Sequence, residues 1–387
     1  MRDFVFQHPT AITFGRDALA RVGEKAAALG KRALLVTGRE SSSRHGSRQQ
    51  ALASLRAAGL SVVELQGVPP NPPLSQARSG IRLARQEGIE LLVALGGGSV
   101  IDCAKAIAAG SLVAHDVWLF FRGKKSIRTA LPVVAVPTLA GSGSETSSGM
   151  VLTHDERREK IGIGNRLLFP RAALLDPLLT CTASPAATAY GTVDAISHLL
   201  EFYLFREESS APLQDGYSEG LMKTLMAACE TALADPDHYR ARAELLWASS
   251  LALNGLSAAG LGKVALPCHL LEHALSGLHD LPHGAGLAAL LPGLLRHQAE
   301  RDPGRLARFA TRVLDLAGAG EKELAWAGIE RFAAWLQAIG TPTSLGDLGL
   351  TSRDLPGLCA QTREQARLWR LSRYGPEVVL EILAASL

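Results

Sequence analysis

The sequence predicts a protein of two domains: an α/β domain built on a parallel sheet, followed by an all-helical domain. The first half alternates short apolar runs with amphipathic stretches, which is the pattern of parallel strands covered by helices on both faces. The second half consists of long stretches rich in Ala, Leu and Glu, without strand-like runs. The character changes near residues 176–184, so we expect domains at 1–180 and 181–387. A length of 387 residues also favours two domains, at about 150 residues each.

Each predicted element follows from its own pattern. Continuous apolar runs that end in turn residues predict four strands, at Ala33–Val36, Leu60–Leu65, Leu91–Leu95 and Leu131–Val136. Amphipathic stretches between them predict helices at Gln50–Ala58 and Leu74–Glu87. In the second half, helical periodicity predicts five long helices, at Pro185–Phe205, Leu213–Leu233, Arg240–Gly262, Arg305–Leu316 and Glu321–Ile339.

Composition excludes several classes of protein. Hydrophobic residues make up 47% of the chain, too many for a disordered protein, and 40 basic against 37 acidic residues leave no electrostatic footprint for nucleic acid. The N-terminus lacks the pattern of a signal peptide. Leu251–Leu271 is apolar but interrupted, so we expect a buried helix and a break rather than a membrane span. Five scattered cysteines without a CxxC pair indicate a reducing compartment, and we expect a cytoplasmic protein.

A glycine-rich segment follows the third predicted strand. Leu91–Leu95 runs into Gly96–Asp102, with the sequence GGGSVID, and then into a helical pattern from Cys103. Glycines allow close backbone approach, and a helix N-terminus offers N–H donors to a phosphate. The segment is neither a GxGxxG fingerprint nor a Walker A loop. Taken alone, it is equally typical of an ordinary strand-to-helix turn.

A second segment dense in glycine and hydroxyl groups, Pro137–Ser148, follows the fourth predicted strand. Two such loops at the carboxyl ends of parallel strands face one crevice, where open α/β sheets bind their ligands. Together they favour a phosphate-containing ligand over a plain turn and a flexible surface linker.

A third pattern predicts a metal site in the helical half. Asp194 and His198 are spaced i and i+4, which places them on one helix face. Four histidines fall between residues 269 and 283: His269, His273, His279 and His283. One carboxylate with several imidazoles suits iron or zinc better than magnesium or calcium. Spacing alone does not fix which imidazoles bind.

In order and spacing, these motifs resemble the iron-containing (group III) alcohol dehydrogenase family over almost the whole chain, from Phe14-Gly15 to the HxxxHxLxxxxxxPHG motif that begins at His269. The resemblance implies an N-terminal dinucleotide-binding α/β domain and a C-terminal helical metal-binding domain, with the metal and the nicotinamide in the cleft between them. It also implies a homodimer that acts on a small-molecule alcohol or aldehyde. From the balanced charge and the absence of a spanning apolar stretch, we expect no nucleic-acid or membrane partner.

Carried over residue by residue, the resemblance implies four metal ligands, Asp194, His198, His269 and His283. His269 and His273 would be catalytic, with His273 in a proton-relay role, whereas His279 matches no ligand and is expected in a loop. The implied cofactor-binding residues are Gly38, Gly97, Gly98, Ser99, Asp102 (at the start of the following helix), Thr138, Leu139, Ser142, Ser147 and Lys160. Asn71 and Gly149 are implied at the substrate.

Two departures from the family pattern affect specificity. Many NAD-preferring relatives have an Asp after the first strand, where this chain has Gly38. Without that carboxylate, and with cationic and hydroxyl groups nearby, NADP is favoured over NAD; these groups are Arg39, Ser41, Ser42, Ser43 and Arg44. The stretch Leu368–Gly375 also lacks an expected Asn-Pro-Arg, which affects the substrate mouth rather than the chemistry.

The sequence therefore predicts an NAD(P)-dependent, metal-dependent alcohol dehydrogenase or aldehyde reductase. Fe²⁺ is the expected ion, with Zn²⁺ as the alternative. Three other functions stay open at this point: a glycerol or polyol dehydrogenase, a maleylacetate reductase relative, and a dehydroquinate-synthase-like lyase. A metal-storing or scaffold protein would leave both glycine loops without a purpose.

Overall fold

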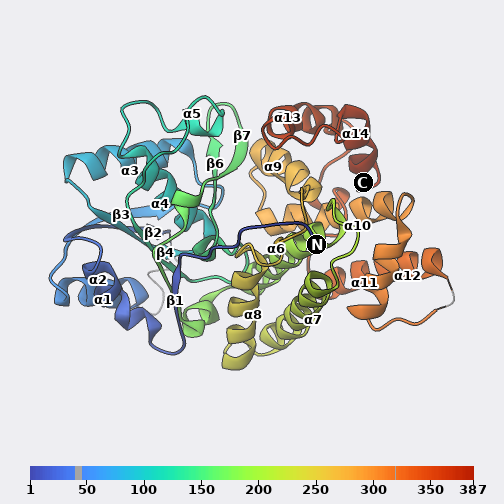
Figure 1. Ribbon diagram of the computed structural model, residues 1–387, viewed down its shortest axis with the longest axis horizontal. Helices are drawn as coiled ribbons and strands as arrows, with labels where there is room; N and C mark the ends of the chain where they lie inside the picture. The colour runs from blue at the N-terminus through green and yellow to red at the C-terminus, as the bar shows by residue number, and fades with distance from the viewer. Residues whose placement is uncertain (40–45, 319) are drawn as a thin grey trace. The chain divides into compact units, whose positions relative to one another are not determined.

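The computed structural model describes residues 1–39, 46–318 and 320–387 and divides the chain into two compact units (Figure 1). The α/β unit comprises Gln7–Ser184 and Asp235–Asn254; the helical unit comprises Met1–Phe6, Pro185–Ala234 and Gly255–Leu387. Two short segments depart from the expected division into 1–180 and 181–387: residues 235–254 belong to the α/β unit and residues 1–6 to the helical unit. Helix α8 (Tyr239–Ala252) contacts η5 (Pro177–Thr182) of the α/β unit. The N-terminal segment joins the helical unit through Arg2, whose backbone N–H donates to Gly260 O.

The α/β unit contains a six-stranded, wholly parallel sheet in the order β1-β8-β5-β4-β2-β3. All four strands expected from the sequence are present, as β2 (Arg32–Gly38), β3 (Ser61–Val68), β4 (Leu91–Gly96) and β5 (Val133–Pro137). Two four-residue strands add to one edge, β1 (Ala11–Phe14) and β8 (Ala172–Leu175), and a separate antiparallel hairpin is formed by β6 (Gly149–His154) and β7 (Glu159–Gly164).

Helices cover both faces of this sheet (Figure 1). Alternate strand residues such as Leu35 and Val93 pack against η1 (Ala18–Arg21), α1 (Val22–Ala27) and α2 (Ser47–Ala57) in one buried cluster. On the opposite face lie α3 (Leu74–Gln86) and α4 (Gly98–Gly110), which contact each other. The shorter elements of the unit are α5 (Trp118–Phe121), η3 (Ser144–Thr146) and η4 (Arg166–Leu168). This confirms the α/β fold class that the apolar runs predict.

The strand order reverses between β2 and β4. From β2 the chain passes outward to β3 and then returns to β4 on the other side of β2. Open parallel sheets bind ligands outside the carboxyl ends of the strands at such a reversal. The carboxyl end of β4 is the GGGS segment, and the carboxyl end of β2 is Gly38.

In the described part of the helical unit, eight helices and one short 3-10 turn pack around a core of their own. Its elements are α6 (Pro185–Leu204), α7 (Pro212–Ala234), α9 (Pro267–His279), α10 (His283–Ala299), α11 (Pro303–Arg312), α12 (Glu321–Ala338), η6 (Gly346–Leu348), α13 (Leu355–Leu368) and α14 (Pro376–Ala384). Helices α6 and α10 contact each other, and α9 contacts both α10 and α13. No helix in the described part of the chain is both long and apolar enough to cross a membrane.

The helix expected at Arg240–Gly262, and the buried helix expected within Leu251–Leu271, are wrong beyond Ala252, where α8 ends. The chain from 253 to 266 forms turns instead. Gly255, Gly260 and Gly262 have φ values of 92°, 74° and 72°, a conformation that favours glycine and cannot continue a right-handed helix.

Candidate functional site

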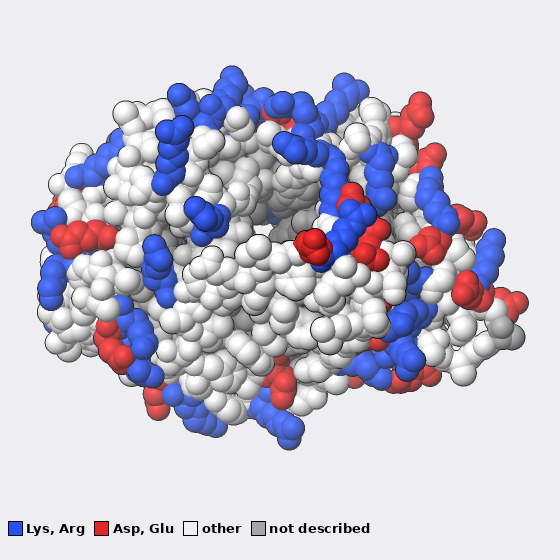
Figure 2. Space-filling model, viewed as in Figure 1, with Lys and Arg blue, Asp and Glu red and all other residues white. Residues whose placement is uncertain are grey.

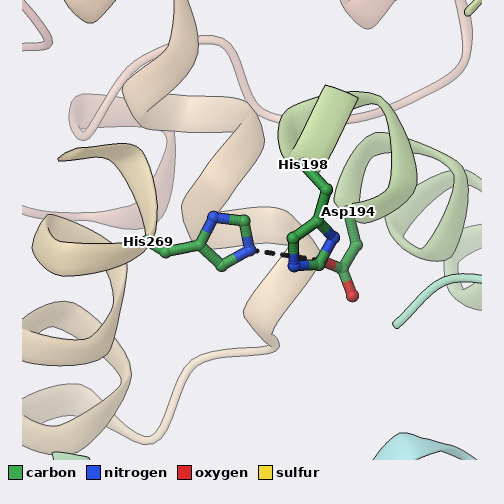
Figure 3. A group of neighbouring side chains, drawn as sticks. All are labelled: Asp194, His198 and His269. Atoms are coloured by element: carbon green, nitrogen blue, oxygen red, sulfur yellow. Dashed lines mark ion pairs between the residues drawn. The ribbon is translucent and has the colours of Figure 1, made fainter. Parts of the chain in front are cut away.

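One face of α6 carries three acidic or imidazole side chains. Asp194, His198 and Glu201 are spaced i, i+4 and i+7, so they lie along the same side of the helix, and all three are buried. Asp194 and His198 point toward His269 of α9 (Figure 3). Two helices of the same unit therefore bring together residues that are about 70 positions apart in the chain.

The carboxylate of Asp194 is at the centre of this cluster. Its Oδ1 lies 3.4 Å from Nδ1 of His198, 3.5 Å from Nε2 of His269 and 3.7 Å from Nε2 of His283. Oδ1 of Asp194, Nδ1 of His198 and Nε2 of His269 are buried and have no hydrogen-bond partner in the structure. Buried polar atoms are nearly always paired, so three unpaired atoms that converge fit a shared cation. The residues expected as ligands are thus brought together.

His269 is held from behind by Glu201. One carboxylate oxygen of Glu201 accepts from the backbone N–H of Cys268 (2.6 Å) and of His269 (3.3 Å). The other oxygen contacts Nδ1 of the His269 ring. Because Nδ1 then donates its proton to Glu201, the lone pair of Nε2 faces Asp194, which is the orientation that a metal ligand needs.

His283, the first residue of α10, has a similar arrangement. Its Nδ1 contacts the carboxylate of Glu272, and its Nε2 faces Asp194. The hydroxyl of Ser276 donates to the other oxygen of Glu272. Neither Glu201 nor Glu272 was expected at the site from the sequence. The available signal was spacing, since Glu201 lies seven residues after Asp194 and Glu272 three residues after His269.

The electrostatics of the cluster favour a bound cation. Burial on its own raises the pKa of Asp194, but the imidazoles of His283, His198 and His269 together hold it well below its usual range. Burial lowers the pKa of His198 to about 3. The pKa of His269 is raised to about 10, because the carboxylates of Glu201 and Asp194 outweigh the lowering by burial. A cation bound at Nε2 of His269 takes the place of that proton.

His273 lies one turn beyond His269 on α9. Its ring centroid is 6.4 Å from that of His269 and 5.8 Å from that of His283, so it borders the cluster. The side-chain amide of Gln365 on α13 hydrogen-bonds to Nδ1 of His273 (2.7 Å). Trp369 meets the same ring edge-on, with centroids 5.5 Å apart. His279, in contrast, is the last residue of α9 and is exposed, so it stands apart from the cluster, although within the helix and not in a loop.

In the α/β unit, helix α4 starts earlier than the sequence pattern indicates. It begins at Gly98, with Gly97 as its N-cap, and not near Cys103. Gly97, Gly98 and Ser99 therefore lie at the helix N-terminus, where the first N–H groups have no intrahelical acceptor. This end of the helix directly follows β4 at the reversal of strand order, so its N–H groups are available to a phosphate.

Asp102 was expected at the helix start, and that position is wrong, because it lies in the second turn of α4. Its carboxylate accepts from Oγ of Ser144 (2.6 Å) and from the backbone N–H of Val151 (3.0 Å). Burial raises the pKa of Asp102, although the ammonium groups of Lys105 and Lys160 favour its charged form. In the structure, Asp102 therefore holds the second loop and the hairpin against α4.

The two glycine-containing loops touch each other. A Cβ placed on Gly98 would lie 2.2 Å from Oγ of Ser142, so a side chain at 98 would require Ser142 to move. Leu139 packs next to Gly97, and the N–H of Thr138 donates to Gly96 O at 3.1 Å. The cofactor residues expected from the two loops are thus adjacent in the structure.

Lys105 of α4 anchors the second loop and was not anticipated. It is fully buried, and its Nζ donates to Ser144 O (2.7 Å), Ser144 Oγ (3.0 Å), Ser147 O (2.9 Å) and Gly149 O (2.7 Å). Four oxygens around one ammonium fix the path of residues 144–149. That segment includes Ser147 and Gly149, which were expected at the cofactor and the substrate.

Two further expected residues lie at the carboxyl edge of the same sheet. Gly38 ends β2 and Asn71 follows β3, with φ of 49° at Asn71. The N–H of Thr153 donates to Pro72 O (2.9 Å), which ties the Asn71 turn to hairpin strand β6. Arg39 is exposed, whereas Ser41, Ser42, Ser43 and Arg44 lie outside the described residues. Figure 2 shows acidic and basic side chains interspersed over the visible face.

A parallel sheet with a glycine loop at its strand reversal, in one chain with a buried Asp/His cluster, is typical of enzymes that combine a dinucleotide with a metal. The family model of iron-containing alcohol dehydrogenases matches residues 9–177, and the model of the C-terminal part of the same family matches residues 188–386.

Individual relatives agree with this class. The chain is 38% identical over 389 residues to the probable NADH-dependent butanol dehydrogenase 1 of Bacillus subtilis (strain 168), with 100% of both chains covered. It is 33% identical to the NADPH-dependent aldehyde reductase of Escherichia coli (strain K12), with 94% of each chain covered. The crystal structure of NADH-dependent butanol dehydrogenase A from Thermotoga maritima matches with a TM-score of 0.95 at 36% identity, covering 100% of this chain and 99% of that one.

The chain belongs to the iron-containing alcohol dehydrogenase family. It is an NAD(P)-dependent oxidoreductase of that family. The fold class, the family and the class of enzyme expected from the sequence are confirmed.

Proposed function

We propose that this enzyme reduces short aliphatic aldehydes to alcohols, and reverses that reaction, with a divalent cation held by Asp194, His198, His269 and His283. The single observation that carries the proposal is the convergence of three unpaired buried atoms, Asp194 Oδ1, His198 Nδ1 and His269 Nε2. The relatives named as butanol dehydrogenases and as an aldehyde reductase support the substrate class.

In this proposal, the chain's own residues bind the cation and the substrate, orient the substrate and exchange a proton with it. When bound, the cation acts as a Lewis acid on the substrate oxygen and the nicotinamide carries the hydride. His273 is the proposed proton relay: Gln365 engages its Nδ1, which makes Nε2 the nitrogen for exchange. Trp369, edge-on to His273, limits the space beside it and favours short unbranched substrates. Asn71 and Gly149 are proposed to contact the substrate.

For the dinucleotide, we propose that the 1–180 region binds it and the 181–387 region binds the metal. The contact residues are those expected from the sequence: Gly38, Gly97, Gly98, Ser99, Asp102, Thr138, Leu139, Ser142, Ser147 and Lys160. Gly38 carries no carboxylate to repel a 2′-phosphate, which favours NADPH over NADH. Relatives of both preferences exist, NADH-dependent and NADPH-dependent.

The proposed ion is Fe²⁺, with Zn²⁺ as the alternative, because a carboxylate with three imidazoles accepts either. The proposed assembly is a homodimer in the cytoplasm. Five free cysteines support a reducing compartment.

An anaerobic activity screen tests the proposal. The metal-depleted protein is reloaded with Fe²⁺ or Zn²⁺ and assayed with NADH and NADPH against butanal, other short aldehydes, and the corresponding alcohols and diols. The proposal expects turnover that needs added metal, is higher with NADPH, and is highest with short aldehydes. Equal turnover in the metal-depleted protein contradicts the metal assignment, and a preference for diols favours a polyol dehydrogenase.

A further inference from the structure

We infer that Glu201 and Glu272 are positioning residues of the metal centre, each of which fixes one histidine so that its Nε2 faces Asp194. The inference rests on the metal site proposed above. Neither glutamate is among the four expected ligands, and both are 0% exposed. A buried carboxylate is costly unless donors satisfy it, so the partners of each indicate what it does.

The partners of Glu201 are all at the start of α9. One oxygen accepts from the backbone N–H groups of Cys268 and His269, and the other contacts Nδ1 of the His269 ring. The carboxylate therefore caps the helix and sets the ring orientation at once. With Nδ1 engaged on one side, Nε2 is left on the other, 3.5 Å from Asp194 Oδ1.

Glu272 contacts two side chains. One oxygen receives the hydroxyl of Ser276, and the other contacts Nδ1 of His283. The position is tight, because a Cβ on Gly286 would lie 3.0 Å from Cγ of Glu272 and 3.2 Å from its Oε1. Glycine at 286 thus lets the carboxylate reach His283.

The Glu201–His269 and Glu272–His283 pairs have the same arrangement. A glutamate of α6 holds a histidine of α9, and a glutamate of α9 holds a histidine of α10. Carboxylates that accept from the second nitrogen of a ligand histidine raise its basicity and fix its tautomer, and their loss typically weakens metal affinity about 10–100-fold. We expect that effect at both glutamates here.

An alternative interpretation makes Glu272 a metal ligand itself. Glu272, His273 and His283 also place one ligand atom each within 4.8 Å of one another, so Glu272 could itself bind a second ion. The contact between Glu272 and Nδ1 of His283 favours the positioning role, because that nitrogen is then engaged by the carboxylate. The number of ions per chain separates the two readings.

The test measures metal binding by the full chain. Zn²⁺ is titrated, against a competing chelator, into four proteins stripped of metal with a chelator: wild type, Glu272→Ala, Glu272→Gln and Glu201→Gln. The visible spectrum of bound Co²⁺ then reports the geometry of the ligands. Glu219→Gln is the matched control, a buried glutamate of α7 that hydrogen-bonds to Tyr203 (2.9 Å) and lies outside the cluster. The melting temperature of the stripped proteins reports folding.

We expect one ion per chain, a Kd raised about 10–100-fold in Glu272→Ala with an altered Co²⁺ spectrum, and a smaller increase in Glu272→Gln, whose amide oxygen still accepts from Nδ1. Glu201→Gln should lower both affinity and melting temperature; Glu219→Gln should leave affinity unchanged. Unchanged Kd and spectrum in a folded Glu272→Ala overturn the inference, as do two ions per chain that fall to one in Glu272→Gln. Metal retention by His269→Ala overturns the proposed site itself.

Discussion

Nζ of Lys105 donates to both the carbonyl oxygen and the hydroxyl oxygen of Ser144, at 2.7 and 3.0 Å, from the interior of helix α4. The same ammonium reaches the carbonyl oxygens of Ser147 and Gly149. A single buried cation thus shapes the loop that follows β5, which we propose to contact the dinucleotide. The relationship makes loop geometry dependent on one side chain.

Replacing that side chain should loosen the loop. Lys105→Met leaves three carbonyl oxygens without their donor, and each unsatisfied buried group costs about 1–3 kcal/mol. We expect the free energy of unfolding to fall by roughly 3 kcal/mol and the KM for the dinucleotide to rise more than the kcat falls. Urea unfolding and steady-state kinetics measure both, with the exposed Lys125→Met as the control. An unchanged KM would show that the loop does not depend on Lys105.

The same lysine should make stability depend on pH. Burial lowers the pKa of Lys105 to about 8 from the ordinary 10.5. Between these values the unfolded chain keeps the proton that the folded chain has lost, so this group raises the free energy of unfolding as pH rises. The difference in unfolding free energy between wild type and Lys105→Met should therefore grow between pH 8 and pH 10. A difference that shrinks over this interval contradicts the sign.

Gln365 should support proton transfer through His273. Gln365→Leu removes the hydrogen bond to Nδ1, so the ring loses its fixed orientation. We expect kcat to fall about tenfold, less than the roughly 10²–10⁴-fold that a positioned acid or base contributes in full, because the ring itself remains, while metal content stays unchanged. Gln361→Leu, one turn earlier on α13, is the matched control. Equal loss of kcat in both variants would assign the effect to helix packing.

Dinucleotide choice should depend on Gly38. Gly38→Asp adds a carboxylate at the end of β2 that can bond a ribose and repel a 2′-phosphate. The ratio of kcat/KM for NADPH to that for NADH should fall about tenfold or more, a difference of roughly 1.4 kcal/mol. Gly38→Ala separates the charge from the added bulk. The assignment of this position fails if both variants keep the wild-type ratio.

The sequence predicts the fold where the pattern is long. Four apolar runs became β2 to β5, and most long amphipathic stretches became helices within a few residues. Strands β1 and β8 were missed because four residues at a sheet edge give too little periodicity. The helix after Ala252 was overextended because Ala and Leu continue past it, although glycines with positive φ end it.

The site was predictable only in part for a physical reason. Asp194 and His198 share a helix, so their spacing reveals one face, whereas His283 was assigned only through family resemblance. Glu201, Glu272 and Lys105 are charged residues inside helices, where a solvent-exposed position is the usual outcome. Only the packing of α6 on α9 and α10, and of α4 on the loop after β5, shows that they are buried and partnered.

The central claim is that Asp194 and the three histidines hold a metal on which turnover depends. The most direct measurement compares anaerobically prepared wild type and His269→Ala for metal per chain, aldehyde reduction and dinucleotide binding by fluorescence. We predict about one ion per chain in the wild type, and in His269→Ala loss of both metal and turnover with dinucleotide affinity nearly unchanged. Wild-type turnover in metal-free His269→Ala would contradict the claim.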